Sequence, residues 1–253
     1  MNLSQSLSSL LGLAFVLVFF GLLTFFAIAG RKNPNRNLRD VPAFGRLRRL
    51  AGLAVEAGTR LHISIGRGGM VGAKSGAALA GLTVLERVTR AASISDRPPV
   101  ATAGEGALAI LAGDGLQQAY QAVNADAQFS PSSARLTGLT PLSFAAGAMQ
   151  VIHDEQVSTN VMIGDFGSEI GLMAEAAERS GSLLIAGSDQ PAAQAILFAA
   201  AQEPLLGEDV FAGGAYLGSA PAHAASLRAQ DVLRWIIILV SLVGALLRLA
   251  GVI

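Results

Sequence analysis

The sequence lacks cysteine and carries little charge. With no cysteine among its 253 residues, disulfide bonds and thiolate metal sites are excluded. Charged residues make up 14% of the chain and hydrophobic residues 52%, whereas an ordinary soluble domain has about 25% charged residues. The apolar excess indicates membrane segments, and the Ala- and Gly-rich remainder is long enough for one domain with a buried core.

Two stretches are apolar and carry few charges or none, as a helix that crosses a bilayer requires. Residues 10–30 are apolar and uncharged, and a helix needs roughly 20 such residues to cross a hydrocarbon core of about 30 Å. The second stretch covers residues 232–253, where Arg234 and Trp235 suit the headgroup level at its start. Arg248 follows about 20 Å along the helix, where its long side chain can reach the opposite boundary. We expect two transmembrane helices.

A cleaved signal peptide is the alternative for the first stretch. The residues Ala27-Ile28-Ala29 match a small-x-small cleavage site. An uncleaved anchor is favoured because residues 1–9 have no basic residue, the apolar run is long, and basic residues follow at once.

Charge is distributed unevenly although the formal net charge is zero. Residues 31–49 contain seven basic residues and one acid, net +6, whereas residues 50–231 contain nine basic and seventeen acidic residues, net −8. A basic segment beside a span suits anionic lipid rather than nucleic acid. It also predicts an inner (cell) membrane protein with a cytoplasmic domain and both termini outside. The residues expected at the membrane surface are Arg31, Lys32, Arg36, Arg39, Arg46, Arg48, Arg49, Arg234 and Trp235.

These features divide the chain into four parts. Residues 1–30 form the first span, 31–58 a basic juxtamembrane linker and amphipathic helix, 59–231 the cytoplasmic domain, and 232–253 the second span. The helix at residues 43–57 suits either the membrane interface or the first packing helix of the domain. We expect a mixture, with its start at the membrane and its end against a sheet.

The middle of the chain alternates between short apolar runs and helical patterns. Strands are expected at residues 61–65, 99–102, 134–139, 160–163, 183–186 and 204–206. Helices are expected at residues 72–92, 106–123, 141–155, 168–180, 191–201 and 208–217. This alternation predicts an α/β fold with a doubly wound, mainly parallel sheet of about five or six strands. Any ligand cleft would lie beyond the carboxyl ends of the strands.

A series of short motifs recurs at the predicted element boundaries. They are Ile65-Gly66-Arg67-Gly68-Gly69, Phe144-Ala145-Ala146-Gly147, Gly164-Asp165-Phe166 with Ser168-Glu169, Ile185-Ala186-Gly187-Ser188-Asp189, and Ala215-Tyr216-Leu217 before residues 226–231. In this order they resemble the DUF6754 domain, an uncharacterised bacterial membrane family. The resemblance covers nearly everything from the basic segment to the second span, and it implies no catalytic residue.

The glycines after the first strand have two interpretations. Gly66, Gly68, Gly69 and Gly72 lie where a dinucleotide-binding protein wraps its backbone around a pyrophosphate. The spacing does not match, because Val71 stands where a third glycine or alanine belongs. A tight turn that lets a helix pack closely on the sheet is the favoured interpretation. If a ligand binds, the candidate residues are Gly66, Arg67, Gly68, Gly69, Lys74, Glu105, Asp165, Glu169 and Asp189.

Acidic residues gather at the predicted carboxyl ends of strands, namely Glu105, Asp165, Glu169, Asp189, Glu208 and Asp209. Such acids can bind a metal or act as acid and base. The favoured alternative is helix capping, with Asp165, Ser168 and Ser188 or Asp189 at N-cap positions.

The remaining chemistry-bearing residues show no site pattern. His62, His153 and His223 lack ligand spacing, and no serine lies in a nucleophile elbow. Any catalytic residue therefore stays unknown, no metal site or cofactor is expected, and a hydrolase is disfavoured.

Two functions remain open. The first is a membrane-anchored scaffold that self-associates, for example into a ring, and that binds unidentified protein partners. Its small side chains allow close subunit contact, and small-x-x-x-small pairs occur in the spans. The alternative is a tethered binding or enzymatic domain for a nucleotide, a phosphorylated metabolite or a divalent ion.

Overall fold

The structure is a computed structural model, and it describes residues 3–30, 38–72, 75–218 and 221–251. The chain divides into two compact units. One unit comprises residues 1–39 and 220–253, and the other comprises residues 40–219.

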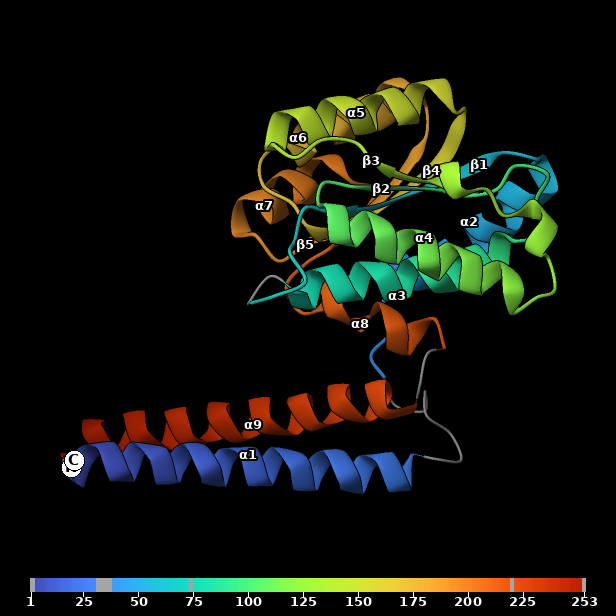
Figure 1. Ribbon diagram of the computed structural model, residues 1–253. Helices are drawn as coiled ribbons and strands as arrows, with labels where there is room; N and C mark the ends of the chain where they lie inside the picture. The colour runs from blue at the N-terminus through green and yellow to red at the C-terminus, as the bar shows by residue number, and fades with distance from the viewer. Residues whose placement is uncertain (1–2, 31–37, 73–74, 219–220, 252–253) are drawn as a thin grey trace. The chain divides into compact units, whose positions relative to one another are not determined.

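The first unit consists of two long apolar helices. Helices α1 (Leu3–Ala29) and α9 (Pro221–Leu249) pack side by side in opposite directions (Figure 1). Both are long and apolar enough to cross a membrane. Most of their large side chains are exposed, for example Phe20 at 64% and Leu239 at 65%. Pairing the two helices therefore leaves most of their apolar surface uncovered.

The second unit is built on a six-stranded, all-parallel sheet. Its strands are β1 (Arg60–Gly66), β2 (Val100–Ala103), β3 (Ala134–Leu136), β4 (Val157–Asp165), β5 (Leu183–Ser188) and β6 (Glu203–Leu205). The strand order is β3-β2-β1-β4-β5-β6, and every neighbouring pair is parallel. The predicted doubly wound α/β fold is confirmed.

Helices cover both faces of this sheet (Figure 1). One face carries α2 (Pro42–Ala57), α3 (Ser75–Ala92), α4 (Gly106–Gln121) and α8 (Asp209–Tyr216), and the other α5 (Pro141–Asp154), α6 (Ile170–Arg179) and α7 (Pro191–Ala200). The chain crosses the sheet in one direction from β1 to β3 and in the other from β4 to β6. Right-handed crossovers therefore place the two sets of helices on opposite faces. Two short 3₁₀ helices between α4 and β3, η1 (Asp126–Gln128) and η2 (Pro131–Ser133), were not predicted.

Helix α2 packs on the domain through the apolar stripe that the sequence indicated. Phe44 and Leu47 are fully buried, and the Phe44 ring stacks on Tyr216 at 5.1 Å. Arg46 forms an ion pair with Glu203 at 2.6 Å, and Arg48 donates a hydrogen bond to the Tyr216 carbonyl. Two of the expected membrane-surface arginines thus have partners within the domain.

The other expected membrane-surface residues are placed as follows. Arg49 is exposed on α2. On α9, Arg234 lies 3.6 Å from Asp231, and Trp235 is 70% exposed. Arg39 lies just before α2, whereas Arg31, Lys32 and Arg36 fall outside the described residues.

A row of buried polar side chains crosses the middle of the sheet. The His62 ring lies 2.8 Å from Asn160 through Nδ1 and 2.8 Å from Thr102 through Nε2. The Thr102 and Ser64 hydroxyls are 3.0 Å apart, and the Asn160 amide donates to Ser182 at 2.7 Å. Because buried polar groups are costly unless bonded, this row ties β2, β1, β4 and the start of β5 into one register.

Burial keeps the His62 ring neutral. Desolvation lowers its pKa from 6.5 to about 4, the hydrogen bond with Asn160 opposes this shift, and the Arg135 charge adds to it. The Asn160 amide nitrogen binds Ser182, so its oxygen faces the ring and accepts from Nδ1.

The pKa of His62 makes the stability of the domain sensitive to acid. The folded pKa lies below the unfolded value, so the unfolded state binds more protons between pH 6.5 and 4. The free energy of unfolding has its full value above pH 6.5 and decreases as the pH is lowered through this window. At pH 5 the loss is about 2 kcal/mol. In urea unfolding of the full chain in mild detergent at pH 7.5 and 5, His62→Gln should remove this part of the loss. His153→Gln, at an exposed position, should retain it. Equal acid sensitivity of the two variants would contradict the assignment.

Candidate functional site

The strand order points to one edge of the sheet as the candidate site. In an open parallel sheet, ligands bind beyond the carboxyl ends of the strands where the strand order reverses. Here the reversal lies between β1 and β4, which end at Gly66 and Asp165. The glycine loop and the Gly164–Glu169 segment that the sequence singled out therefore meet at this point.

Backbone contacts bring the ends of β1, β2 and β4 together. Gly66 has a φ of +75°, and a Cβ there would overlap the Asp165 carbonyl oxygen. The next amide, of Arg67, donates to that same oxygen at 2.9 Å, and the Gly104 amide donates to the Gly66 carbonyl at 2.9 Å. Only glycine satisfies both the positive φ and this close approach. The turn function expected of Gly66 therefore has a direct structural basis.

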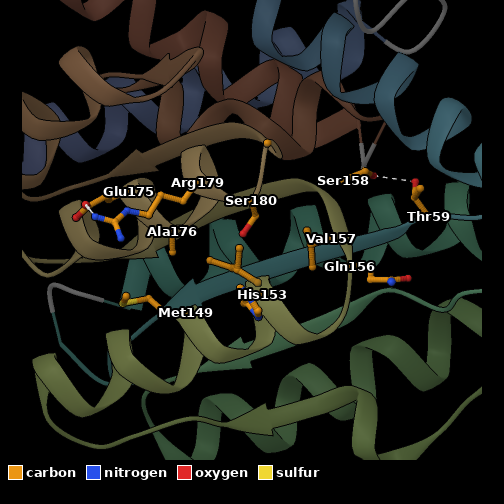
Figure 2. A pocket seen from close by; sticks show the side chains of 12 residues that line it. Thr59, Met149, His153, Gln156, Val157, Ser158, Glu175, Ala176, Arg179 and Ser180 are labelled. Atoms are coloured by element: carbon orange, nitrogen blue, oxygen red, sulfur yellow. Dashed lines mark hydrogen bonds and ion pairs between the residues drawn. The ribbon is translucent and has the colours of Figure 1, made fainter.

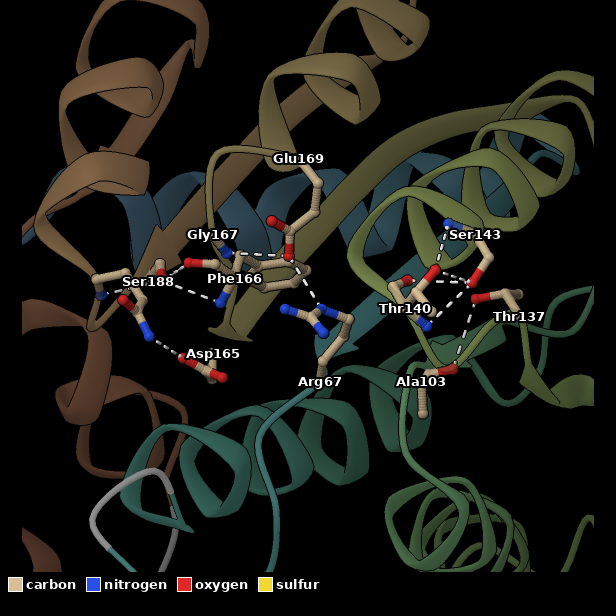
Figure 3. A network of polar contacts seen from close by, with 11 residues as sticks. Arg67, Ala103, Thr137, Thr140, Ser143, Asp165, Phe166, Gly167, Glu169 and Ser188 are labelled. Atoms are coloured by element: carbon tan, nitrogen blue, oxygen red, sulfur yellow. Dashed lines mark hydrogen bonds and ion pairs between the residues drawn. The ribbon is translucent and has the colours of Figure 1, made fainter.

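An ion pair lies across this edge (Figure 3). The Arg67 Nε donates to Glu169 Oε1 at 3.1 Å, and the same oxygen accepts from the Gly167 amide at 3.0 Å. The Arg67 stem lies against Gly104, where a Cβ would overlap its Cγ. The side chain of Glu169 is 4% exposed and that of Arg67 is 22% exposed. The Glu169 carboxylate thus binds two groups that would otherwise suit an anionic ligand, a guanidinium and a loop amide.

A second set of contacts joins β4 to β5. The buried Asp165 carboxylate accepts from the Gln190 amide at 2.6 Å. The buried Ser188 hydroxyl donates to the Phe166 carbonyl at 2.9 Å, and it lies 3.1 Å from the Phe166 amide. These bonds fix the loop after β4 against the loop after β5.

The capping role expected of the acidic residues is found at Glu105, whereas the specific N-cap positions that were named are wrong. Glu105 caps α4 by accepting from the Leu108 amide at 2.8 Å. Asp165, Ser168 and Ser188 or Asp189 do not occupy N-cap positions. The N-cap residues of α6 and α7 are Glu169 and Gln190, and no side-chain capping bond is found at either among the described residues. The reason is that β4 and β5 continue through Asp165 and Ser188, whose side chains bond across the neighbouring loops instead.

The structure brings four predicted site residues together, Gly66, Arg67, Asp165 and Glu169. Gly68 is buried and Gly69 half-buried in the same loop. Asp189 follows β5 directly, Glu105 is bound to its own helix, Asp209 opens α8 after Glu208, and Lys74 lies outside the described residues. The structure adds two residues that the sequence did not single out, Gly104 and Gln190, and it gives Ser188, expected as an N-cap, a bridging position instead. For Gly104 and Gln190, the position shortly after a predicted strand is the sequence signal that points to them.

In the described part of the site, the loop after β1 forms a tight turn and does not have the geometry of a dinucleotide-binding loop. Helix α3 begins at Ser75, several residues beyond the end of β1, whereas a dinucleotide site places the helix N-terminus directly behind the glycine turn. Among the described residues no group of three or more His, Asp or Glu side chains could hold a metal ion.

Comparison with known proteins assigns the chain to a family. A family model described as a domain of unknown function (DUF6754) matches residues 4–253. No curated protein matches the chain, and no solved structure matches it.

The Arg67–Glu169 pair should contribute measurably to stability. Glu169→Gln leaves a largely buried guanidinium without its carboxylate, and we expect a loss of about 2 kcal/mol, discounted for the partial exposure of Arg67. Glu175→Gln is the matched control, because it removes the exposed pair with Arg179, which is worth less than about 0.5 kcal/mol. Urea unfolding of both variants measures the difference. Equal losses would show that the Arg67 pair is as weak as a surface pair.

Proposed function

Since the chain belongs to the DUF6754 family, whose function is unknown, we propose a function from the fold and the site. The protein is a membrane-anchored α/β protein that self-associates and serves as a scaffold or structural component of a membrane assembly.

The apolar helices support the membrane anchor. Exposed apolar surface costs roughly 25 cal/mol per Å² in water, and large side chains are exposed along the candidate spans of α1 and α9. A bilayer covers such surface on all sides of a helix pair. Helices also satisfy their backbone hydrogen bonds internally, as a hydrocarbon environment requires.

One observation supports a structural role for the domain rather than a catalytic one. At the edge of the sheet where this fold binds ligands, the polar side chains bind one another: Arg67 binds Glu169, Gln190 binds Asp165, and Glu105 binds its own helix. A ligand would have to break these bonds in order to enter. The edge therefore suits a fixed, structural domain better than an open catalytic cleft.

Exposed apolar side chains near the edge strand β3 provide a contact surface for a second copy. Leu139 and Leu142 are each 69% exposed and Leu136 is 49% exposed. They lie on and after β3, in a tight turn where a Cβ on Gly138 would overlap the backbone of Ser143. Strand β3 pairs only with β2 in the described sheet, and an unpaired edge favours association with another chain. Identical copies anchored in one membrane can form such contacts repeatedly and so assemble into a closed, symmetric oligomer.

The mass of the protein in solution tests whether it self-associates. We expect the full chain in mild detergent to have a mass several times that of the 25.9 kDa protomer. The double variant Leu139→Glu, Leu142→Glu should lower the mass toward that of one protomer, because it places charges in an apolar contact. The control Phe198→Glu, at a 70% exposed position on α7, should leave the mass unchanged. A wild-type monomer at micromolar concentration would refute the proposal.

The basic segment supports one orientation in the membrane. Seven basic residues follow the first span within about twenty positions, whereas residues 1–9 contain none. Basic flanks stay on the cytoplasmic side. We therefore place the α/β domain in the cytoplasm and both termini outside.

Cysteine labelling tests this orientation, since the natural chain has no cysteine. In intact cells a membrane-impermeant thiol reagent should label Ser6→Cys and leave Ser132→Cys, at an exposed position of the domain, unlabelled. Both variants should react after permeabilisation. The reverse pattern in intact cells would invert the topology.

A second candidate function is ligand binding at the same edge. It is favoured by the strand order, which places the glycine loop at the reversal point of the sheet. A nucleotide, phosphorylated metabolite or divalent ion that binds there would raise the melting temperature, because binding adds RT ln(1 + [L]/Kd) to the stability. Arg67→Ala should abolish the shift caused by a phosphorylated ligand, and Asp165→Asn should abolish the shift caused by a divalent ion. A broad screen without any shift would count against this candidate and leave the scaffold proposal unaffected.

A further inference from the structure

A cavity lies at the end of the sheet opposite the candidate site. It has a volume of about 850 Å³ and lies where β4 begins, between the C-terminal halves of α5 and α6 (Figure 2). Small-molecule sites in proteins typically measure about 300–1,000 Å³. The cavity has the size of a ligand site although the sequence directed attention to the carboxyl ends of the strands.

The floor of the cavity is apolar and belongs to the core. Ile152 and Val157 are buried at 0% and 5% exposure. Met149 and Ala176 are half-buried, and each packs against the core cluster beneath the cavity. These four side chains provide a surface for the apolar body of a ligand, fixed in place by α5, α6 and β4.

The rim is polar but electrically balanced. Among the described residues that line the cavity, Glu175 and Arg179 are charged at neutral pH and bind each other at 2.6 Å, and the His153 ring lies 3.1 Å from Asp154. The Thr59 hydroxyl donates to the Ser158 hydroxyl at 2.9 Å. The exposed Glu175–Arg179 pair offers a charged ligand little attraction, whereas the apolar floor penalises a net charge. The rim therefore suits a ligand without net charge.

The ends of two helices determine the kind of polar group that fits. Helices α5 and α6 end at Asp154 and Arg179, beside the cavity lining. The last carbonyls of a helix carry partial negative charge and attract hydrogen-bond donors. At the end of α6 the carbonyls of Ala176, Ala177 and Glu178 already accept from the amides of residues 180–182, so a ligand donor would share a carbonyl through its second lone pair. A hydroxyl or amide N–H is the matching group on an uncharged ligand.

One residue of the cavity wall ends helix α5. Gln156 follows the C-cap Glu155 and has a φ of +52°, the left-handed conformation in which helices commonly end. Its side-chain oxygen accepts from Arg97 at 2.5 Å, so this part of the wall is held in place.

We propose that the cavity between α5 and α6 binds a small, uncharged amphipathic molecule. Its apolar body lies on Met149, Val157 and Ala176, and its hydroxyl or amide donor faces the ends of the two helices. This site is separate from the Arg67–Glu169 edge, and its occupancy does not depend on self-association.

Methionine NMR tests the proposal. The chain has five methionines, of which Met149 lines the cavity, whereas Met162 and Met173 are fully buried in the core. The full chain in lipid nanodiscs with ¹³C-methyl methionine is titrated with 2-naphthol, an uncharged apolar ring with one donor. We expect a saturable shift of Met149 and none of Met162 and Met173. The naphthyl carboxylate and the naphthyl methylammonium should bind about tenfold more weakly, because the apolar floor removes water from their charge.

Variants that fill the cavity complete the test. Ala176→Phe and, at the exposed mouth, Ser180→Trp should abolish the Met149 shift. Ala146→Phe, at an exposed position of α5 outside the lining, should preserve it. The Ser180→Trp variant keeps the test valid if Ala176→Phe impairs folding. An unsaturable shift shared by all methionines, unchanged binding in the filled variants, or tighter binding of a charged analogue would each overturn the proposal.

Discussion

The close backbone contact between β1 and β4 is the constraint on which the rest of the domain depends. A Cβ on Gly66 would overlap Asp165, and one on Gly164 would overlap Ile65, so both strands need glycine at their carboxyl ends. Gly81 of α3 is equally restricted by the Ile163 carbonyl. These glycines join the two halves of the sheet at the point where the strand order reverses, and they let α3 pack directly on that junction.

Different kinds of side chain lie along the β1–β4 junction, from the carboxyl ends of the strands to the amino ends. At the carboxyl ends, the close approach brings Arg67 and Glu169 into contact, and internal bonds take up the polar groups. In the middle, the neutral His62 ring connects neighbouring strands. At the amino ends, α5 and α6 leave an apolar-floored cavity. The carboxyl ends of the strands, where polar side chains bind one another, are thus closed, whereas the amino ends of the same strands carry the open cavity.

The two units of the chain have contrasting surfaces. The helix pair exposes apolar side chains along its length, whereas acidic residues outnumber basic ones in the segment from residue 50 to residue 231. A bilayer can cover the apolar surface of a helix pair, and an acidic domain is repelled by anionic headgroups. This contrast is the physical basis of the membrane-anchored arrangement that we propose.

The sequence by itself determined the local elements of this protein. Buried parallel strands form short apolar runs such as the one at residues 61–65, and Gly or Pro marks their ends, so strands and helices are predicted to within a few residues. Span length and the order of the motifs likewise indicated the two long apolar helices and the DUF6754 family. Only the tertiary structure decided the strand order, the pairing of Arg67 with Glu169, the bridging role of Ser188, and the cavity at the amino ends. Each of these joins residues that are distant in the sequence. Local spacing specifies helix and strand periods, but it contains no information on which distant segments pack together.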